Sequence, residues 1–202
     1  MTAKPVLAAI TGASGAIYAR LLLKALLEDW QGDVLLVVSD AGKRLLREEE
    51  GVEYSSDSTD FTGAMGLDAS LANRLRIISN NEIGAGPASG SFPLHGMAIV
   101  PCSMRTLAAV ANGLADNLIC RAADVCLKEH RRLVMAPRET PLNAIHLENM
   151  LKLAQTGARI VPPSPAFYFH PQSLEDAALF IIQKILEQLD IPVTNPRRWE
   201  PR

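Results

Sequence analysis

The stretch Val6-Leu-Ala-Ala-Ile-Thr-Gly-Ala-Ser-Gly-Ala16 decides the fold, because it predicts a buried strand, a tight turn and the start of a helix. Residues 6–10 are continuously apolar, as expected for a parallel strand that is covered on both faces. From Ala16 onward, apolar side chains recur at helical spacing. The order strand, turn, helix is the first unit of an α/β fold.

The turn in this stretch is suited to an anionic group. Its glycines let a ligand approach the backbone closely, and the first amides of the helix carry partial positive charge. Ser14 adds a hydroxyl that either caps the helix or contacts the ligand. The full G-x-G-x-x-G pattern is missing, which weakens a dinucleotide interpretation. A plain strand-to-helix turn with a capping serine stays open as the alternative.

The totals predict a single globular domain over residues 1–202. Of these residues 48% are hydrophobic and 21% charged, and the net charge of −2 indicates neither a nucleic-acid footprint nor a polybasic membrane patch. No apolar run reaches transmembrane length, and no secretory leader is recognisable. The three cysteines form no CxxC pair and the four histidines show no ligand spacing. We therefore expect a cytoplasmic protein without a metal.

Further apolar runs alternate with helical segments along the chain. Strands are expected at 34–38, 75–78, 97–100, 133–136 and 160–161. Helices are expected at 41–50, 104–112, 118–129, 142–155 and, after the capping residue Ser173, up to residue 189. Residues 51–70 are expected to form a loop or weak helix, and the tail 190–202 to be mostly irregular. This alternation predicts a three-layer, doubly wound Rossmann-like (flavodoxin-like) sheet, mostly parallel.

Polar residues follow the expected strands, where ligands of such sheets bind. They are Ser14, Ser39, the Ser89–Ser91 loop, Ser103–Thr106, Arg138 with Glu139, and Tyr168. Hydroxyls together with arginines suit a phosphate ester. Plainer interpretations are helix caps for Ser39 and Ser103, and an exposed ion-pair ladder for Arg121, Asp124 and Lys128.

Several of these motifs together resemble the UbiX-type flavin prenyltransferases, within the homo-oligomeric flavin-containing decarboxylase-like superfamily. The motifs are Thr11-Gly-Ala-Ser-Gly15, Ala88-Ser-Gly-Ser91, Pro101-Cys-Ser-Met-Arg-Thr106, Arg121-Ala-Ala-Asp-Val125, Pro137-Arg-Glu-Thr-Pro-Leu142, His146-Leu-Glu-Asn-Met150 and Phe167-Tyr168. They run in order from about Val6 to Trp199. Pro-Arg-Glu-Thr-Pro is the most specific of them.

The resemblance implies a metal-independent enzyme that binds FMN and dimethylallyl phosphate. It implies transfer of the dimethylallyl group to N5 and C6 of the reduced flavin. The prenylated FMN would then serve a UbiD-type decarboxylase, often in ubiquinone biosynthesis. It also implies a homo-oligomer, commonly a dodecamer, with sites between subunits.

The resemblance also assigns residues. Those implied to hold FMN are Gly12, Ala13, Ser14, Ser39, Ser103, Met104, Arg105, Thr106 and Arg138. Those implied to hold dimethylallyl phosphate are Ser89, Gly90, Arg121, Lys128, Tyr168, Lys184 and Trp199, the last from the 190–202 tail. Glu139 would manage protons with support from Ser14, and Glu49 would complete the polar wall. Lys184 stands where many relatives carry arginine, so a bidentate grip is lost there.

Three other classes are weighed against this one. An FMN-dependent cysteine-type decarboxylase has the same fold but usually a catalytic histidine, a Pro-Ala-Ser-Ala-Asn-Thr motif and a Pro-x-Met-Asn motif. In place of the first motif this chain has Pro101-Cys-Ser-Met-Arg-Thr106, and Arg138-Glu139 precedes Pro141-Leu-Asn143. A short-chain dehydrogenase needs a Tyr-x-x-x-Lys pair, which is absent. A non-catalytic FMN carrier would not need Glu139, Tyr168 or the lysines. The choice between monophosphate and diphosphate donor, and between Glu139 and Glu49 as proton carrier, stays open.

Overall fold

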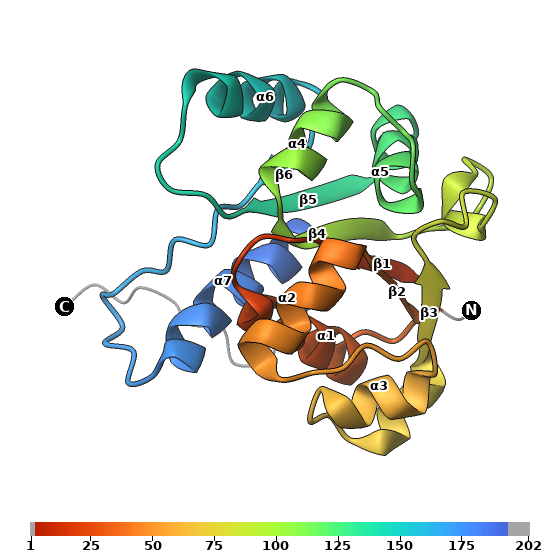
Figure 1. Ribbon diagram of the computed structural model, residues 1–202, viewed down its shortest axis with the longest axis vertical. Coiled ribbons are helices and arrows are strands. Elements are labelled where there is room, and N and C mark those ends of the chain that lie inside the picture. Colours follow the sequence, from red (N-terminus) through yellow and green to blue (C-terminus); the bar gives the residue numbers. More distant parts are fainter. Residues whose placement is uncertain (1–2, 194–202) are drawn as a thin grey trace.

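The computed structural model describes residues 3–193, which form one parallel sheet with helices on both faces (Figure 1). All its strand pairings are parallel, and the strand order is β3-β2-β1-β4-β5-β6. The strands are β1 Val6–Ile10, β2 Val34–Val38, β3 Leu75–Ser79, β4 Gly96–Cys102, β5 Arg132–Pro137 and β6 Arg159–Ile160. This is the doubly wound Rossmann order, so the predicted fold class is confirmed.

The helices divide between the two faces of the sheet, as Figure 1 shows. One face carries α1 Ala16–Asp29, α2 Asp40–Glu50, α3 Ser58–Ala64 and α7 Leu174–Gln188. The other carries α4 Met104–Ala111, α5 Leu118–Lys128 and α6 Ala144–Gln155. Two short 3-10 turns, η1 Ala69–Arg74 and η2 Gly86–Ala88, precede β3 and β4. None of the helices between residues 3 and 193 has the length and apolarity needed to cross a bilayer.

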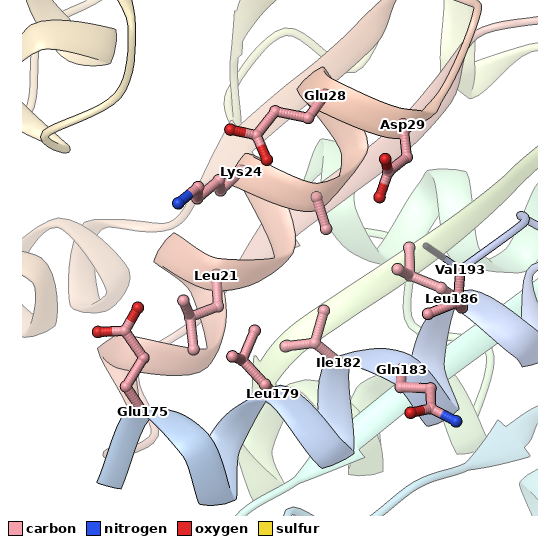
Figure 2. Close-up of a pocket in the computed structure, with 11 residues that line it drawn as sticks. Leu21, Lys24, Glu28, Asp29, Glu175, Leu179, Ile182, Gln183, Leu186 and Val193 are labelled. Carbon is pink, nitrogen blue, oxygen red and sulfur yellow. The ribbon is translucent and has the colours of Figure 1, made fainter. Parts of the chain in front are cut away.

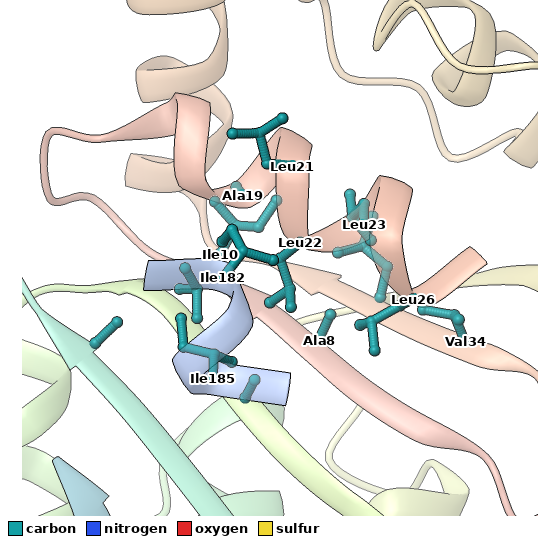
Figure 3. Packing of buried hydrophobic residues seen from close by; sticks show 14 of the residues in the cluster. Ala8, Ile10, Ala19, Leu21, Leu22, Leu23, Leu26, Val34, Ile182 and Ile185 are labelled. Carbon is teal, nitrogen blue, oxygen red and sulfur yellow. The ribbon is translucent and has the colours of Figure 1, made fainter. Parts of the chain in front are cut away.

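The period-2 alternation of β1 divides the apolar core into two layers. Ala8 and Ile10 face α1 and α7, whereas Leu7 and Ala9 face α4 and α5. Figure 3 shows the first layer, in which leucines of α1 and isoleucines of α7 meet over the strand. Every residue of β1 is buried, which is why its sequence is continuously apolar rather than alternating.

The expected boundaries are close to the observed ones, with local differences that capping explains. Helix α6 begins at Ala144 rather than at residue 142, because Asn143 caps it by accepting a hydrogen bond from the His146 amide at 2.9 Å. Residues 112, 129 and 189 are the C-caps of α4, α5 and α7 and not their last helical residues. The last strand covers 159–160 instead of 160–161.

The region 51–70 is more ordered than expected. It contains α3, whose N-cap Asp57 accepts hydrogen bonds from the amides of Thr59 and Asp60. Phe61 anchors that helix in the core and is fully buried. Of the two expectations for this segment, a loop or a weak helix, the helix is thus confirmed over Ser58–Ala64.

Candidate functional site

The site lies where β1 and β4 are neighbours but their following helices leave to opposite faces, which opens a crevice at their carboxyl ends. Thr11 joins the two strand ends. Its hydroxyl accepts a hydrogen bond from the Ser103 amide at 2.7 Å and donates one to the Pro101 carbonyl at 2.9 Å. Thr11 was not among the predicted site residues. A buried polar residue directly after a fully apolar strand was the signal that could have found it.

The turn after β1 packs directly against the start of α2. The Ser39 amide donates to the Ile10 carbonyl at 3.0 Å, and the Ser39 hydroxyl caps α2 by accepting from the Gly42 amide at 3.0 Å. A Cβ added to Gly12 would collide with the Cβ of Ala41. Glycine is therefore required at residue 12 for the turn to reach α2, and the two predicted FMN residues Gly12 and Ser39 lie together.

A carboxylate occupies the start of α1. The amides of Gly15 and Ala16 each donate to Oε2 of Glu49 at 2.8 Å, and the Ser14 hydroxyl bonds to the same carboxylate. One interpretation of the sequence had Ser14 capping α1, and the structure does not show that cap. Glu49, from the end of α2, takes the place of a capping side chain. The packing of α2 against α1 brings these groups together across 33 and 34 residues of sequence.

Glu49 stays ionised in this setting. Partial desolvation raises its pKa, but the hydrogen bonds from Ala16, Ser14 and Gly15 and the charge of Arg138 together hold the pKa below its ordinary value. The carboxylate is therefore an acceptor at neutral pH.

Arg138 connects β5 to the turn. Its amide donates to the Cys102 carbonyl at 3.3 Å, and its Nε donates to the Ser14 carbonyl at 3.0 Å. The side chain thus spans from the end of β5 to the turn after β1, beside Glu49. The crevice brings together Gly12, Ala13, Ser14, Ser39, Glu49, Ser103 and Arg138.

The start of α4 forms the opposite wall of the crevice. The Ser103 hydroxyl accepts from the Thr106 amide at 3.2 Å and donates to the Thr106 hydroxyl at 3.0 Å. The interpretation of Ser39 and Ser103 as helix caps is thus confirmed, although both caps also border the crevice. Met104 packs partly against the core, and exposed Arg105 approaches Asp116 at 4.0 Å in the α4–α5 connection.

A second group of predicted residues lies along α5. Arg121 pairs with Asp124 at 2.9 Å, as the ion-pair interpretation expected, and its Nε donates to the Ala88 carbonyl at 3.2 Å. Lys128 pairs with its neighbour Glu129. A Cβ on Gly90 would lie 2.8 Å from Nζ of Lys128, so the loop touches the end of α5.

The position of this loop corrects one expectation. Gly90 contacts the end of α5, which leads into the amino end of β5, so the Ser89–Ser91 loop does not gather with the crevice at the carboxyl edge. In Figure 1, α5 and the loop before β4 lie at the right, whereas the β5–α6 connection lies at the left. The sequence rule failed because the long β3–β4 connection returns along α5 to the other end of the sheet.

A third group lies near α7. The rings of Tyr168 and Phe180 meet edge to face with centroids 6.1 Å apart, and Nζ of Lys184 lies 5.8 Å from the Phe180 centroid. Lys184 also pairs with Glu187 at 2.8 Å.

Glu139 is exposed, and its Oε1 accepts from the Thr140 amide at 3.0 Å. Trp199 lies outside the described residues.

A cavity of about 400 Å³ lies between α1 and α7, as Figure 2 shows. Leucines and an isoleucine form its floor, and Lys24, Glu28 and Glu175 its rim. No predicted site residue lines it. Across residues 3–193, no three His, Cys, Asp or Glu side chains are grouped as a metal site would require. The polar crevice between β1 and β4 is therefore the stronger candidate.

Comparisons with known proteins show the family. A family model described as Flavoprotein matches residues 1–190. The chain is 48% identical over 197 residues to flavin prenyltransferase LpdB of Lactiplantibacillus plantarum, with 98% of each chain covered. Its structure is similar to that of AnUbiX (PadA1) in complex with FMN and dimethylallyl pyrophosphate, with a TM-score of 0.87, 37% identity and 98% of each chain covered. It is also similar to a dodecameric FMN-dependent UbiX-like decarboxylase from Escherichia coli O157:H7, with a TM-score of 0.85, 39% identity, and 98% of this chain and 100% of that chain covered.

Proposed function

Because this chain belongs to the flavoprotein family and, within it, to the flavin prenyltransferases, we propose that it joins the dimethylallyl group of dimethylallyl phosphate to N5 and C6 of reduced FMN. The product, prenylated FMN, would serve a UbiD-type decarboxylase, as in ubiquinone biosynthesis. One observation carries the proposal: the Gly12–Ser14 turn is seated on α2 and held by Arg138, at the switch point where such sheets bind nucleotides.

The crevice fits FMN chemically. Gly12 leaves open backbone where a Cβ would collide with α2, and Ser39 and Ser103 place hydroxyls at two helix starts. Hydroxyls, helix amides and an arginine are the groups that bind phosphate monoesters. We assign FMN to Gly12–Ser14, Ser39, Arg138 and the segment Ser103, Met104, Arg105 and Thr106. When bound in reduced form, FMN supplies the nucleophilic N5 and C6 positions.

The donor reacts by breaking its allylic C–O bond, and the phosphate leaves with the electron pair. Cations must neutralise that phosphate, while aromatic faces tolerate positive charge on the allyl carbons. Arg121, Lys128 and Lys184 supply the cations, with Tyr168 as a hydroxyl donor. We assign Ser89 and Gly90 to the allyl chain. We assign Trp199, from the 190–202 tail, as the aromatic side chain that faces the allyl carbons. In this proposal residues 1–202 form a single flavin-binding domain.

Glu139 rather than Glu49 is the proton carrier in this proposal. Three donors and a nearby arginine keep Glu49 ionised, so it is a poor acid. Glu139 is exposed beside Arg138 and is held through one oxygen by the Thr140 amide. It can donate a proton to the departing phosphate. Ring closure would use up the allyl double bond, which takes up a proton equivalent to the one lost from N5, and Glu139 can accept the proton lost from C6. We assign Ser14, whose hydroxyl bonds to Glu49, a supporting role in the transfer.

In one copy of the chain the α5 group of site residues lies at the other end of the sheet from the crevice. We therefore propose that several copies complete each site, as a dodecamer would. Helix α6 supports this, because Leu153 is its one buried residue among those described. Its exposed apolar residues, with those of the neighbouring loops, would be covered by another copy; they are Leu114, Leu142, Ile145, Leu147 and Leu151.

Mixing two inactive variants tests the shared site. Arg138→Met and Lys128→Met would each abolish turnover alone, because each removes a part that every site needs. Co-assembled subunits would regain activity, since some sites would receive both native residues from different copies. Arg138→Met mixed with Glu139→Gln is the matched control, because both changes lie on one loop and cannot complement each other. Equal activity in both mixtures would refute sites between copies.

Mass spectrometry of the flavin tests the reaction itself. The protein is incubated anaerobically with reduced FMN and dimethylallyl phosphate, or with the diphosphate, without added metal. The expected product is FMN heavier by one dimethylallyl unit, less the proton replaced. Unmodified, bound FMN with both donors would instead support an FMN carrier, and loss of CO₂ from a cysteine-type substrate would support the decarboxylase.

Glu139→Gln should retain FMN but lower turnover by about 10²–10⁴-fold, as for loss of a general acid. Glu48→Gln, an exposed change on α2, is its matched control. Turnover that is unchanged in Glu139→Gln would remove this residue from the mechanism.

We also propose a cytoplasmic location. The three cysteines are buried free thiols, as in proteins of reducing compartments. Fractionation of cells that produce the full chain tests this, and recovery in an oxidising compartment would contradict it.

A further inference from the structure

Two arginines hold the backbone of the Ser89 loop on either side of that residue. Arg121 donates Nε–H to the carbonyl of Ala88 at 3.2 Å, and Arg131 donates Nη2–H to the carbonyl of Gly90. Ser89 lies between these two carbonyls. Its own amide bonds to the Gly86 carbonyl at 3.0 Å, and its carbonyl accepts from the Phe92 amide at 3.2 Å.

Arg131 reaches this loop from the turn between α5 and β5. Its amide donates to the Cys126 carbonyl at 2.8 Å, and the preceding residue, His130, has a positive φ of 52°. This turn ends α5 and directs the guanidinium toward Gly90. The Nη1 atom of Arg131 is buried without a hydrogen-bond partner in the described part of the chain. Because leaving a buried donor unpaired is unfavourable, this burial indicates a side chain held in place by its surroundings.

The α-carbon of the same glycine lies beside a charged pair. A Cβ on Gly90 would collide with Oε1 of Glu129 and would lie 2.8 Å from Nζ of Lys128. Glu129 bonds to Lys128 and is close enough to Arg131 that the charges of both cations lower its pKa, Lys128 more strongly. Lys128, Glu129 and Arg131 therefore surround one peptide group.

We propose that Arg131 is a positioning residue for the allyl-phosphate site: it fixes Ser89 and Gly90 against the Lys128 ammonium. The inference rests on the proposed function for the role of those three residues, but the contact itself does not. In this proposal Arg131 acts through the loop backbone, because its Nη2 donates to the Gly90 carbonyl. The loop Gly84-Ala-Gly-Pro-Ala-Ser-Gly-Ser91 contains three glycines. Without the arginine on the Gly90 carbonyl, it would sample many backbone conformations.

Arg131→Met removes the donor while keeping much of the side-chain volume, and Arg132→Met is the matched control. Arg132 is the next residue, and its guanidinium pairs with Asp190 at 2.7 Å at the surface. Hydrogen exchange of the FMN-bound protein reads the loop directly. We expect the amides of Ser89 and Phe92 to exchange at least tenfold faster in Arg131→Met and at the native rate in Arg132→Met. Unchanged exchange in Arg131→Met would overturn the proposal.

Kinetics separates positioning from a general loss of structure. In Arg131→Met the KM for dimethylallyl phosphate should rise about tenfold or more, with FMN affinity within twofold of native. Arg131→Lys keeps a hydrogen-bond donor on a shorter side chain, so its KM for dimethylallyl phosphate should lie between those of the native protein and Arg131→Met. Positioning would be refuted if the FMN dissociation constant rose as much as the KM for dimethylallyl phosphate. It would also be refuted if that KM stayed at its native value. If the native protein prenylates no flavin with either donor, the proposed function fails, while the exchange experiment still decides the role of Arg131 in the loop.

Discussion

Replacing Glu49 with glutamine tests whether the carboxylate holds the start of α1. The carboxylate accepts from two helix amides at 2.8 Å each, beside Arg138. Glutamine keeps one oxygen that can accept from an amide but loses the charge that favours a helix N-terminus. The change therefore removes an electrostatic contribution while leaving the packing of α2 intact.

The expected loss of stability is about 1 kcal/mol. Hydrogen bonds to charged groups contribute about 1.5–3 kcal/mol when well shielded, and a charge at a helix N-terminus about 0.3–1 kcal/mol. Glu49 is partly exposed, so solvent screening reduces the first figure. In a chain of this size a loss of about 1 kcal/mol lowers Tm by about 2–4 °C.

The stability lost in Glu49→Gln should be larger at neutral pH than at acidic pH. The pKa of Glu49 is lower in the folded protein than in the unfolded chain, where a glutamate has a pKa of about 4.3. Its contribution is therefore fully present above that value and is lost as pH falls through the lower, folded pKa. The difference between native and Glu49→Gln should persist at pH 7 and shrink below about pH 4.

Urea unfolding at one fixed protomer concentration measures this, because any assembly makes stability depend on concentration. Glu48→Gln is the matched control, since Glu48 forms an exposed i,i+4 pair with Arg44 at 3.1 Å, and such pairs contribute little. A Glu49→Gln loss no larger than that of Glu48→Gln at pH 7, or one of equal size at pH 7 and pH 3.5, would refute the reasoning.

Gly12→Ala should lower the free energy of unfolding by about 1–3 kcal/mol because its Cβ meets Ala41; Gly63→Ala, which faces open space in α3, should be neutral or stabilising in the same urea titration. Ser103→Ala and Ser173→Ala should each cost about 1 kcal/mol as lost N-caps. Only Ser103→Ala should weaken FMN binding in a fluorescence titration; equal weakening would contradict the placement of the crevice. Because burial raises the pKa of all three cysteine thiols, a disulfide reagent at pH 8 should label them only after unfolding, and fast labelling of the native protein would contradict their burial.

Local patterns predicted the elements of this fold well. Continuous apolar runs marked β1 and β2, since both faces of these strands are buried. Helix caps were recognisable where a serine preceded a helical run, as at Ser39 and Ser173. The bounds of the short helix α3, inside the expected loop or weak helix, were not predicted, because Phe61 and Thr62 are its only buried residues within a polar segment. Such a segment has no periodic pattern for its sequence to display.

The site was predicted in composition but not in arrangement. The rule that ligands bind after strands selected Ser14, Ser39, Ser103 and Arg138, which do meet at one crevice. The same rule failed for the Ser89 loop. The rule assumes a short connection after each strand, whereas the β3–β4 connection runs along α5.

By itself, the sequence determined which segments are strands and helices and that the sheet is parallel, and it predicted which turn would approach a ligand. Those properties follow from neighbours a few residues apart, through burial periodicity, glycine geometry and caps. Only the tertiary structure decided that Glu49 closes the start of α1, that Thr11 joins β1 to β4, and that Arg131 holds Gly90. These contacts join residues 34 to 92 positions apart. They exist only because the packing of strands and helices, which no local pattern encodes, brings those side chains within hydrogen-bonding distance.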